Sequence, residues 1–326
     1  MTCCVAALCD DRKAIVLAAD KMVGMGAIET EPEIRKIFSL HHHWRAMLSG
    51  NDIAPAFDII GRAKAKFAMK TALNIGDAQR IVAESYREKR AEEAESRYLR
   101  PLGWTLAMFN SPSSGAMPNA TRTNITYMLQ TYSLTVSLLI AGLDASGKGH
   151  IFSVDDEDNR GSPRRHDIPG YHAIGSGGFG AEYMMAYRDL SPAMPIREAL
   201  YYVTEGKYFG ELASGVGTKT DLYILRFGRS ATRILPKAIE DKLIKLCQKL
   251  EPKELGEKGV EILNSLHGKH MDTIPKLQRK KEGKEWAITA KSDDLGRRPR
   301  VVGVARKRGG VASSSKSSTG RGDAAR

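Results

Sequence analysis

The residues with the clearest chemical potential stand at the start of the chain, which reads Met1-Thr2-Cys3-Cys4-Val5. Removal of Met1, the usual fate of an initiator methionine before a small residue, would leave Thr2 with a hydroxyl and a free α-amine. An unperturbed α-amine has a pKa of about 7.7 to 8.0, so part of it is neutral at neutral pH and can accept a proton. Thr2 would then carry a nucleophile and its own base. Most chains with threonine at position 2 have no such activity, so the inference depends on the residues that follow.

Two short apolar runs follow Thr2, at residues 5–8 and 14–20, with a charged turn between them. Small and β-branched residues dominate both runs, which predicts a β-hairpin whose strands are buried on both faces. The hairpin ends on the carboxylate of Asp20. A further strand over residues 34–38 contains Lys36.

The order of these features resembles the β subunits of the proteasome and the bacterial HslV protease. The resemblance rests on the N-terminal Thr, a strand ending in Ala-Ala-Asp, a Lys-Ile-Phe strand sixteen residues later, and a Ser-Gly turn fourteen residues beyond that. It implies an α+β fold, a four-layer αββα N-terminal-nucleophile hydrolase sandwich of two antiparallel sheets between helix layers. The matching domain covers about residues 1–230, with an insertion at about 98–133.

The resemblance also implies roles for individual residues. Thr2 matches the nucleophile, Asp20 its buried acidic partner, Lys36 the lysine beside the hydroxyl, and Gly50 the glycine whose N–H faces the oxyanion. A cation at Lys36 would favour the alkoxide of Thr2, and Asp20 would hold that cation in place. An oxyanion donor contributes on the order of 3 kcal/mol to other acyl-transfer sites. Each residue alone has an ordinary structural explanation, so the argument is the spacing of all four.

Later segments extend the match. Ser176 takes the place of the serine beside the threonine amine, and Glu211 and Ser214 match an Asp-x-x-Ser-Gly motif in which Glu replaces Asp. The glycines around Ser176 also satisfy a dinucleotide-binding pattern, but the βαβ unit that such a site needs is missing. Met22 stands where active members usually carry an arginine. Glu211 puts the local geometry, rather than the charge, in question, and Met22 would loosen the loop at residues 24–26.

A substrate pocket is expected beside the Ser-Gly turn. By the resemblance, Leu48 lies where the family lines its main specificity pocket, and Asp52 and Ala56 lie on the adjacent helix face. These residue types predict an apolar or mixed pocket.

The sequence pattern predicts further helices and strands in the rest of the domain. Helices are predicted at about 52–70, 77–95, from Gly178, and at 195–210; strands are predicted at 134–143, 149–154, 171–174 and 221–225. The insertion at 98–133 is irregular and rich in proline and glycine, which favours a surface segment at a subunit contact. The acidic run at 155–158 is typical of a solvated loop, with a divalent-ion site as the alternative.

Composition narrows the class of protein. The chain has 326 residues and 42% hydrophobic content, so it can bury a sizeable core. It contains no run of eighteen apolar residues and no basic leader before its first apolar run, so we expect neither a transmembrane helix nor a signal peptide. The four cysteines lack C-x-x-C spacing, so we expect no disulfide framework, no metal site and no cofactor. A cytoplasmic location follows from this cysteine usage. Trimming one residue further would make Cys3 the nucleophile.

The C-terminal region differs in composition. The apolar pattern of residues 231–275 predicts helices packed on the domain or on a neighbouring subunit. Residues 276–326 hold about 15 Lys and Arg against about 5 Asp and Glu, most of the net charge of +12. Few apolar residues occur there, which predicts a disordered tail. Such a tail could bind nucleic acid or an acidic partner, or serve only to solubilise the chain.

Together these features predict a threonine-type endopeptidase that acts on a peptide or protein substrate through an acyl-enzyme. The resemblance implies a homo-oligomeric ring and an ATPase unfoldase as partner, with no membrane association. Two alternatives stay open: a non-proteolytic amidohydrolase on the same fold, and a catalytically silent scaffold whose basic tail binds nucleic acid.

Overall fold

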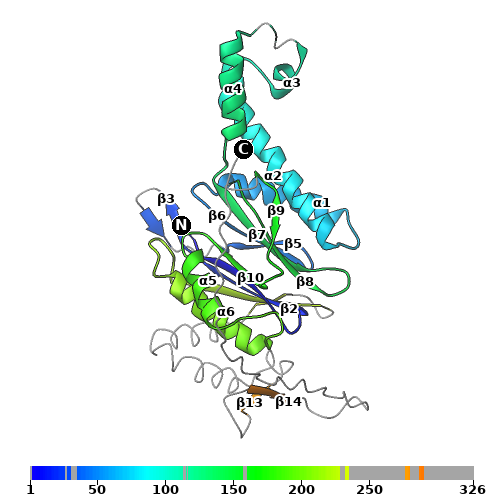
Figure 1. Cartoon of the computed structure of the whole chain (residues 1–326), viewed down its shortest axis with the longest axis vertical. Coiled ribbons are helices and arrows are strands. Elements are labelled where there is room, and N and C mark those ends of the chain that lie inside the picture. The colour runs from blue at the N-terminus through cyan, green and yellow to red at the C-terminus, as the bar shows by residue number, and fades with distance from the viewer. Residues whose placement is uncertain are drawn as a thin grey trace, which may run out of the picture. The chain divides into compact units, whose positions relative to one another are not determined.

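The computed structural model describes residues 2–25, 28–30, 35–112, 115, 117–156, 160–227, 232–234, 276–279 and 286–289, of which 23–25, 28–30, 232–234, 276–279 and 286–289 are described by backbone alone. These residues form an α+β structure with two five-stranded antiparallel sheets and several helices (Figure 1). The predicted fold class is confirmed at this level.

The first sheet, called sheet I here, is built around the N-terminal hairpin. Its strand order is β10 (Tyr171–Ile174), β1 (Cys4–Cys9), β2 (Ala14–Asp20), β11 (Thr220–Arg226) and β12 (Thr232–Ile234). Every residue of β1 and β2 is buried, as the apolar runs predict. The register pairs Cys4 with both Ala19 and Ile174, so Thr2, just before β1, lies at the end of sheet I where β2 reaches Asp20.

The second sheet, sheet II, is formed by β5 (Ile37–His41), β6 (Trp44–Gly50), β7 (Val136–Leu143), β8 (Gly149–Val154) and β9 (Pro163–Arg165), in that order. Its central strands pair Met47 with Leu139 and Ser49 with Ser137. Alternate residues of a strand point to opposite faces, so these four side chains share one face. That face packs against sheet I, because Met47 and Leu139 belong to the same buried cluster as Leu17 of β2.

Each sheet is covered by helices on its other face (Figure 1). Helices α1 (Ala54–Ala68) and α2 (Ile75–Tyr98) pack on sheet II, and α5 (Gly178–Tyr187) and α6 (Ile196–Gly210) pack on sheet I. Asn74 caps α2 by accepting a hydrogen bond from the Asp77 N–H at 2.8 Å. These helices agree with the predicted ones to within a few residues.

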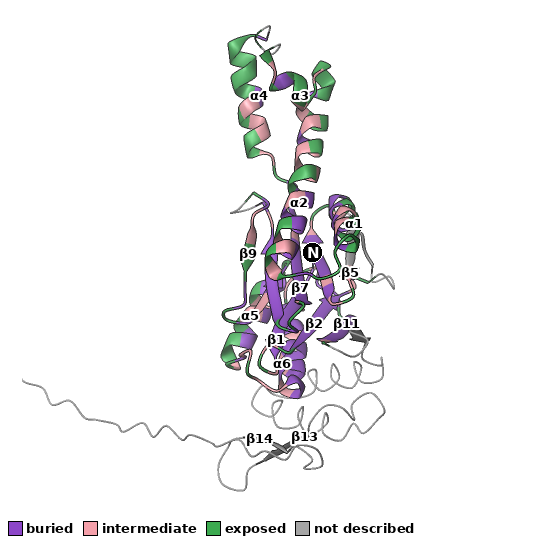
Figure 2. Ribbon diagram, turned by 90° about the vertical axis from the view of Figure 1, so that its right-hand side faces the viewer, coloured by how far each residue is buried: buried purple, intermediate pink, exposed green. Residues whose placement is uncertain are grey.

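The insertion departs from the prediction of an irregular segment. After α2 it forms the short helices η1 (Arg100–Leu102) and α3 (Leu106–Phe109) and then α4 (Asn119–Thr131). Figures 1 and 2 show α3, α4 and the end of α2 standing clear of the two sheets as a largely exposed arm. Leu99, Phe109, Met117 and Ile125 form a small buried cluster of its own, which explains how so polar a segment holds regular structure.

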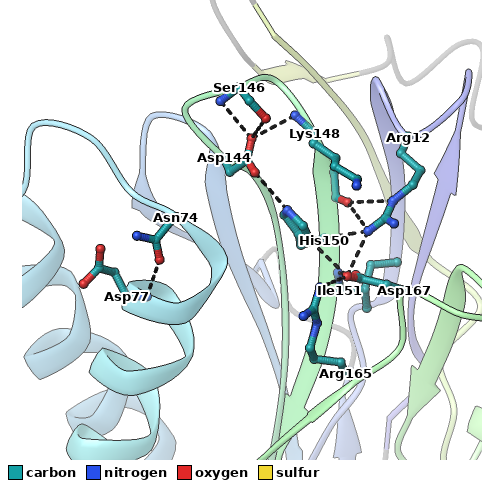
Figure 3. A network of polar contacts seen from close by, with 11 residues as sticks. Arg12, Asn74, Asp77, Asp144, Ser146, Lys148, His150, Ile151, Arg165 and Asp167 are labelled. Atoms are coloured by element: carbon teal, nitrogen blue, oxygen red, sulfur yellow. Dashed lines mark hydrogen bonds and ion pairs between the residues drawn. The ribbon is translucent and has the colours of Figure 1, made fainter.

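A polar network joins the turn of the N-terminal hairpin to sheet II (Figure 3). Arg12 donates to the Gly149 carbonyl at 3.0 Å and pairs with Asp167 at 2.8 Å. His150 lies between Asp167, at 3.0 Å from Nδ1, and Asp144, at 3.1 Å from Nε2. The network fixes the two sheets relative to each other at the end opposite Thr2.

Outside the two sheets, the backbone pairs β3 (Val23–Met25) with β4 (Ile28–Thr30), and β13 (Lys276–Arg279) with β14 (Trp286–Thr289). The β13–β14 pair falls within the predicted disordered tail, and these strands differ from that expectation. The helices predicted for 231–275 and the remainder of the tail lie outside the described residues. Among the described residues, no helix combines the length and apolar character that crossing a bilayer requires.

Candidate active site

Thr2 is held by backbone contacts on both sides. Its carbonyl accepts a hydrogen bond from the Gly177 N–H at 3.1 Å, and the carbonyl of Cys3 accepts one from the Asp20 N–H at 3.1 Å. Its own N–H donates to Ser176 Oγ at 3.3 Å. Thr2 is only 4% exposed, so its hydroxyl has a defined position between the end of β2 and the turn that follows β10.

Lys36 connects Thr2 to Asp20. Its ammonium donates to Thr2 Oγ1 at 2.8 Å and to Asp20 Oδ1 at 2.9 Å. Lys36 is 5% exposed and Asp20 is fully buried, so water screens this ion pair only weakly. The structure thus brings together the three residues that the sequence spacing singles out.

The carboxylate of Asp20 is fixed by several donors besides Lys36. Oδ1 accepts the Cys3 N–H at 2.9 Å, and Oδ2 accepts the N–H groups of Met22 at 3.0 Å and Gly217 at 3.1 Å. These donors fix the orientation of the carboxylate. Met22 contributes through its backbone, so the contact to Asp20 does not depend on which side chain stands at position 22.

Two glycines let the backbone approach closely around Thr2. A Cβ on Gly175, whose φ is +90°, would lie 2.2 Å from the carbonyl oxygen of Thr2. A Cβ on Gly50, at the end of β6, would lie 2.7 Å from the carbonyl oxygen of Thr135. Gly50, Thr2 and Ser176 line one pocket. Glycine is required at both positions by space, and at Gly175 also by backbone conformation.

Glu211 is linked to this group through Lys207. Glu211 forms an ion pair with the buried Lys207, whose ammonium also donates to the Gly217 carbonyl at 2.7 Å. Gly217 in turn donates its N–H to Asp20. Ser214 is exposed, and its hydroxyl makes no hydrogen bond with another described residue. Within the predicted motif, Glu211 is therefore part of the buried polar group, and Ser214 is not brought into it.

Lys207 was not predicted, because a lysine near the end of an amphipathic helix is normally a surface residue. The one feature of the sequence that could have indicated a buried role for Lys207 is Glu211, four residues later, with which it forms an i,i+4 ion pair.

The alternative nucleophile, Cys3, stands between Thr2 and the start of β1. It is fully buried in the cluster between sheet I and helices α5 and α6. Burial raises the pKa of the Cys3 thiol to about 12, against the opposing effect of Lys207. A buried thiol of this kind is a poor nucleophile.

The three predicted substrate-pocket residues are Leu48, Asp52 and Ala56. Leu48 is 2% exposed and Ala56 fully buried, both in the core between sheet II and its helices. Asp52 is exposed and accepts the Ala54 N–H at 2.9 Å, at the start of α1. None of the three lines the pocket that contains Thr2.

That pocket has a volume of about 520 Å³ and is mainly polar. It lies at the Thr2 end of the space between the two sheets, and hydroxyl-bearing residues form much of its wall. The complete lining is Thr2, Ser49, Gly50, Asn51, Ser133, Thr135, Val136, Ser137, Ser153, Asp155, Asp156, Arg164, His172, Ala173, Ile174, Gly175 and Ser176. Of the serines in this wall, Ser176 was predicted from the sequence, whereas Ser49, Ser133, Ser137 and Ser153 were not.

His172 lines the pocket, and His166 lies directly behind it. His166 contacts Ser153 Oγ at 2.9 Å and stacks on His172 with ring centroids 3.6 Å apart. His172 pairs with Glu182 of α5 at 2.5 Å. Burial and the neighbouring His172 lower the pKa of His166 to about 4, so His166 is neutral at neutral pH.

The acidic run at 155–158 gives no metal centre in the described part of the chain. Asp156 accepts the Leu134 N–H at 2.7 Å and pairs with Arg90 at 3.2 Å. No group of three or more His, Cys, Asp or Glu side chains that could hold a metal ion occurs among the described residues.

The geometry around Thr2 therefore combines a hydroxyl, a buried lysine, a fixed carboxylate and an adjoining polar pocket. No protein-family model and no curated protein matches this chain by sequence.

Proposed function

We propose that this chain is a threonine-type N-terminal-nucleophile hydrolase that cleaves peptide bonds, similar to the β subunits of the proteasome and HslV. In this proposal the two sheets and their covering helices are the four-layer αββα sandwich of that class. The observation that carries the proposal is the contact of the Lys36 ammonium with both Thr2 Oγ1, at 2.8 Å, and Asp20, at 2.9 Å.

The reaction begins once Met1 has been removed. The free amine of Thr2 accepts the hydroxyl proton through a water molecule while Oγ1 bonds to the carbonyl carbon of the substrate. The Lys36 ammonium stabilises the negative charge that develops on Oγ1, and the N–H of Gly50 is the proposed donor to the carbonyl oxygen. The C–N bond then breaks, and the α-ammonium returns the proton to the leaving amine. Water hydrolyses the resulting ester and regenerates Thr2.

Asp20 and Ser176 act as positioning residues in this scheme. Asp20 holds Lys36 against Thr2, and three backbone N–H groups fix the carboxylate in turn. Ser176 Oγ lies 3.3 Å from the Thr2 nitrogen, where it orients the amine. A preorganised site of this kind needs little rearrangement during the reaction.

The same resemblance leads us to propose a homo-oligomeric ring, whose closed symmetry would restrict access to the site, with an ATPase unfoldase as partner. These assembly proposals depend on the hydrolase proposal.

The test is N-terminal sequencing and intact mass of the purified full chain, before and after reaction with a β-lactone or epoxyketone. We expect a chain that starts at Thr2 and gains one probe mass there. Thr2→Ala and Lys36→Ala should lose that mass, whereas Lys66→Ala, which removes a half-buried lysine paired with Glu88 on the helices, should keep it.

The outcomes separate the three candidate functions. Labelling together with cleavage of denatured protein supports the peptidase. Labelling with hydrolysis of small amides alone supports the amidohydrolase. A retained Met1, or a mature Thr2 that reacts with neither probe, contradicts the hydrolase and leaves the scaffold, which nucleic-acid binding with and without residues 276–326 would test.

A further inference from the structure

The side chains between the two sheets change from apolar to polar along the length of the sheets. In its deep part, the space between the sheets is filled by apolar side chains, among them Met47 and Leu139 on neighbouring strands of sheet II. Two residues nearer to Thr2 on the same face, these strands carry Ser49 and Ser137, which are paired in register. The apolar layer is therefore replaced by hydroxyls where it opens into the pocket beside Thr2.

The hydroxyls of Ser49 and Ser137 have no hydrogen-bond partner among the described residues. Both residues line the pocket, and Ser49 is only 5% exposed. Water can bond to these hydroxyls while the pocket is empty, and a ligand that displaces this water without replacing its hydrogen bonds costs about 1 to 3 kcal/mol per hydroxyl. These two groups are therefore placed to gain a hydrogen bond from whatever fills the pocket.

Charged residues of the lining are compensated or lie at its rim. Asp156 is paired with Arg90 and His172 with Glu182. Arg164 is exposed and Asp155 is half-buried, and their charges are opposite. The three polar residues of the lining with the lowest exposure, Thr2, Ser49 and Ser153, carry hydroxyl side chains.

These observations select one kind of ligand group. An apolar side chain would displace water from the hydroxyls of Ser49 and Ser137 and leave them without partners, and a charged side chain placed against them would exchange its hydration for two uncharged hydroxyls. We propose that this pocket binds an uncharged, hydrogen-bonding side chain of the substrate, such as asparagine, glutamine or serine, next to the bond that Thr2 cleaves. The inference rests on the proposed hydrolase function and differs from the apolar or mixed pocket expected from Leu48, Asp52 and Ala56.

The test compares fluorogenic peptides that differ at one position by shape-matched residues, asparagine against leucine and glutamine against methionine. Each position within two residues of the cleaved bond is varied in turn. For the wild-type protein we expect kcat/KM to favour the polar member at least tenfold at one position. The ratio of the two kcat/KM values cancels any general loss of activity, so it reports the pocket alone.

The deciding variant is Ser49→Ala/Ser137→Ala, which should reduce that ratio at least fivefold. Ser85→Ala is the matched control, because Ser85 is a fully buried serine of α2 that donates to the Ile81 carbonyl away from the pocket. It should leave the ratio unchanged.

Three results would overturn the inference. A wild-type protein that is labelled at Thr2 but prefers the apolar peptides contradicts the pocket assignment alone. An unchanged ratio in the double variant does the same. A wild-type protein whose Thr2 is never labelled contradicts the proposed function, and the pocket assignment with it.

Discussion

The ammonium nitrogen of Lys36 lies 2.8 Å from the hydroxyl oxygen of Thr2, although thirty-four positions of the chain separate the two residues. The contact forms because β1 and the start of β5 belong to different sheets that meet at this end of the molecule. It is the feature on which the proposed chemistry most directly depends.

Lys36→Ala should abolish hydrolysis and leave a less stable protein. Loss of the cation removes stabilisation of the Thr2 alkoxide, and we expect kcat/KM to fall by about 100-fold or more. It also leaves Asp20 buried without its ion-pair partner, which should lower the free energy of unfolding by about 3 to 5 kcal/mol. Urea denaturation followed by circular dichroism measures the second effect, so that activity is compared only under folded conditions. If the Lys36→Ala variant kept the wild-type kcat/KM, Lys36 would have no part in the reaction.

Gly175→Ala should displace Thr2. Gly175 and Gly103 both have positive φ, +90° and +75°. A Cβ added at Gly175 would lie 2.2 Å from the Thr2 carbonyl oxygen, whereas a Cβ added at Gly103 would meet nothing within 4 Å. The left-handed conformation costs roughly 1 to 2 kcal/mol for alanine at either position. The clash should add about 1 to 3 kcal/mol at Gly175 alone.

The two alanine variants are compared by urea denaturation and by the rate at which an electrophile labels Thr2. We expect Gly103→Ala to label like the wild type and Gly175→Ala to label more slowly. Equal stability and equal labelling of the two variants would show that the close approach at Gly175 is not needed.

The elements that could be predicted from the sequence are those with a strong local pattern. The all-buried hairpin of β1 and β2 is evident from its small and β-branched residues, and the spacing of Thr2, Asp20 and Lys36 indicated their proximity. The arm could not be predicted, because α4 is rich in Thr and Asn, which are weak helix formers. Its helices depend on a small cluster whose members, such as Leu99 and Ile125, are far apart in sequence.

The pocket could not be predicted for a related reason. Ser49 and Ser137 become neighbours only through the register between β6 and β7, and a single serine in a strand carries no signal of its own. Leu48 was expected to line the pocket, but the alternation along β6 points it to the opposite face from Ser49. One position along a strand thus decides between core and pocket.

Arg90→Ala should loosen the connection between the arm and the pocket. Arg90 of α2 donates to the Gln130 carbonyl at 3.1 Å and pairs with Asp156 at 3.2 Å, while Asp156 accepts the N–H of Leu134 at 2.7 Å. These contacts fix the segment that carries Ser133 and Thr135 into the pocket wall. Because Asp156 is buried, we expect a loss of about 3 kcal/mol in the free energy of unfolding.

Arg87→Ala provides the matched control for Arg90. Arg87 lies on the same helix, is exposed, and donates to Ser162 Oγ at 3.1 Å. Its loss should change stability by no more than about 0.5 kcal/mol. Thermal and urea unfolding of both variants make the comparison, and equal losses would show that the Arg90–Asp156 pair does not hold the segment.

His166 should make stability depend on pH between about 4 and 6.5. An unfolded histidine titrates near pH 6.5, whereas burial and His172 lower the pKa of His166 to about 4 in the folded protein. Between these values the unfolded chain binds the additional proton, so the free energy of unfolding falls as the pH is lowered. Below pH 4 both states are protonated and the effect of this residue ends. We expect His166→Gln to reduce the fall by about 1 to 3 kcal/mol.

The measurement is urea denaturation of the wild type and His166→Gln at intervals from pH 7.5 to 3.5. Glutamine keeps a group that can hydrogen-bond to Ser153, so the comparison isolates the titration from the loss of that contact. His42→Gln, which replaces an exposed histidine in the turn between β5 and β6, should retain the wild-type slope. If His166→Gln also retains that slope, then another group carries the pH dependence, and His166 supports the pocket residue His172 by packing alone.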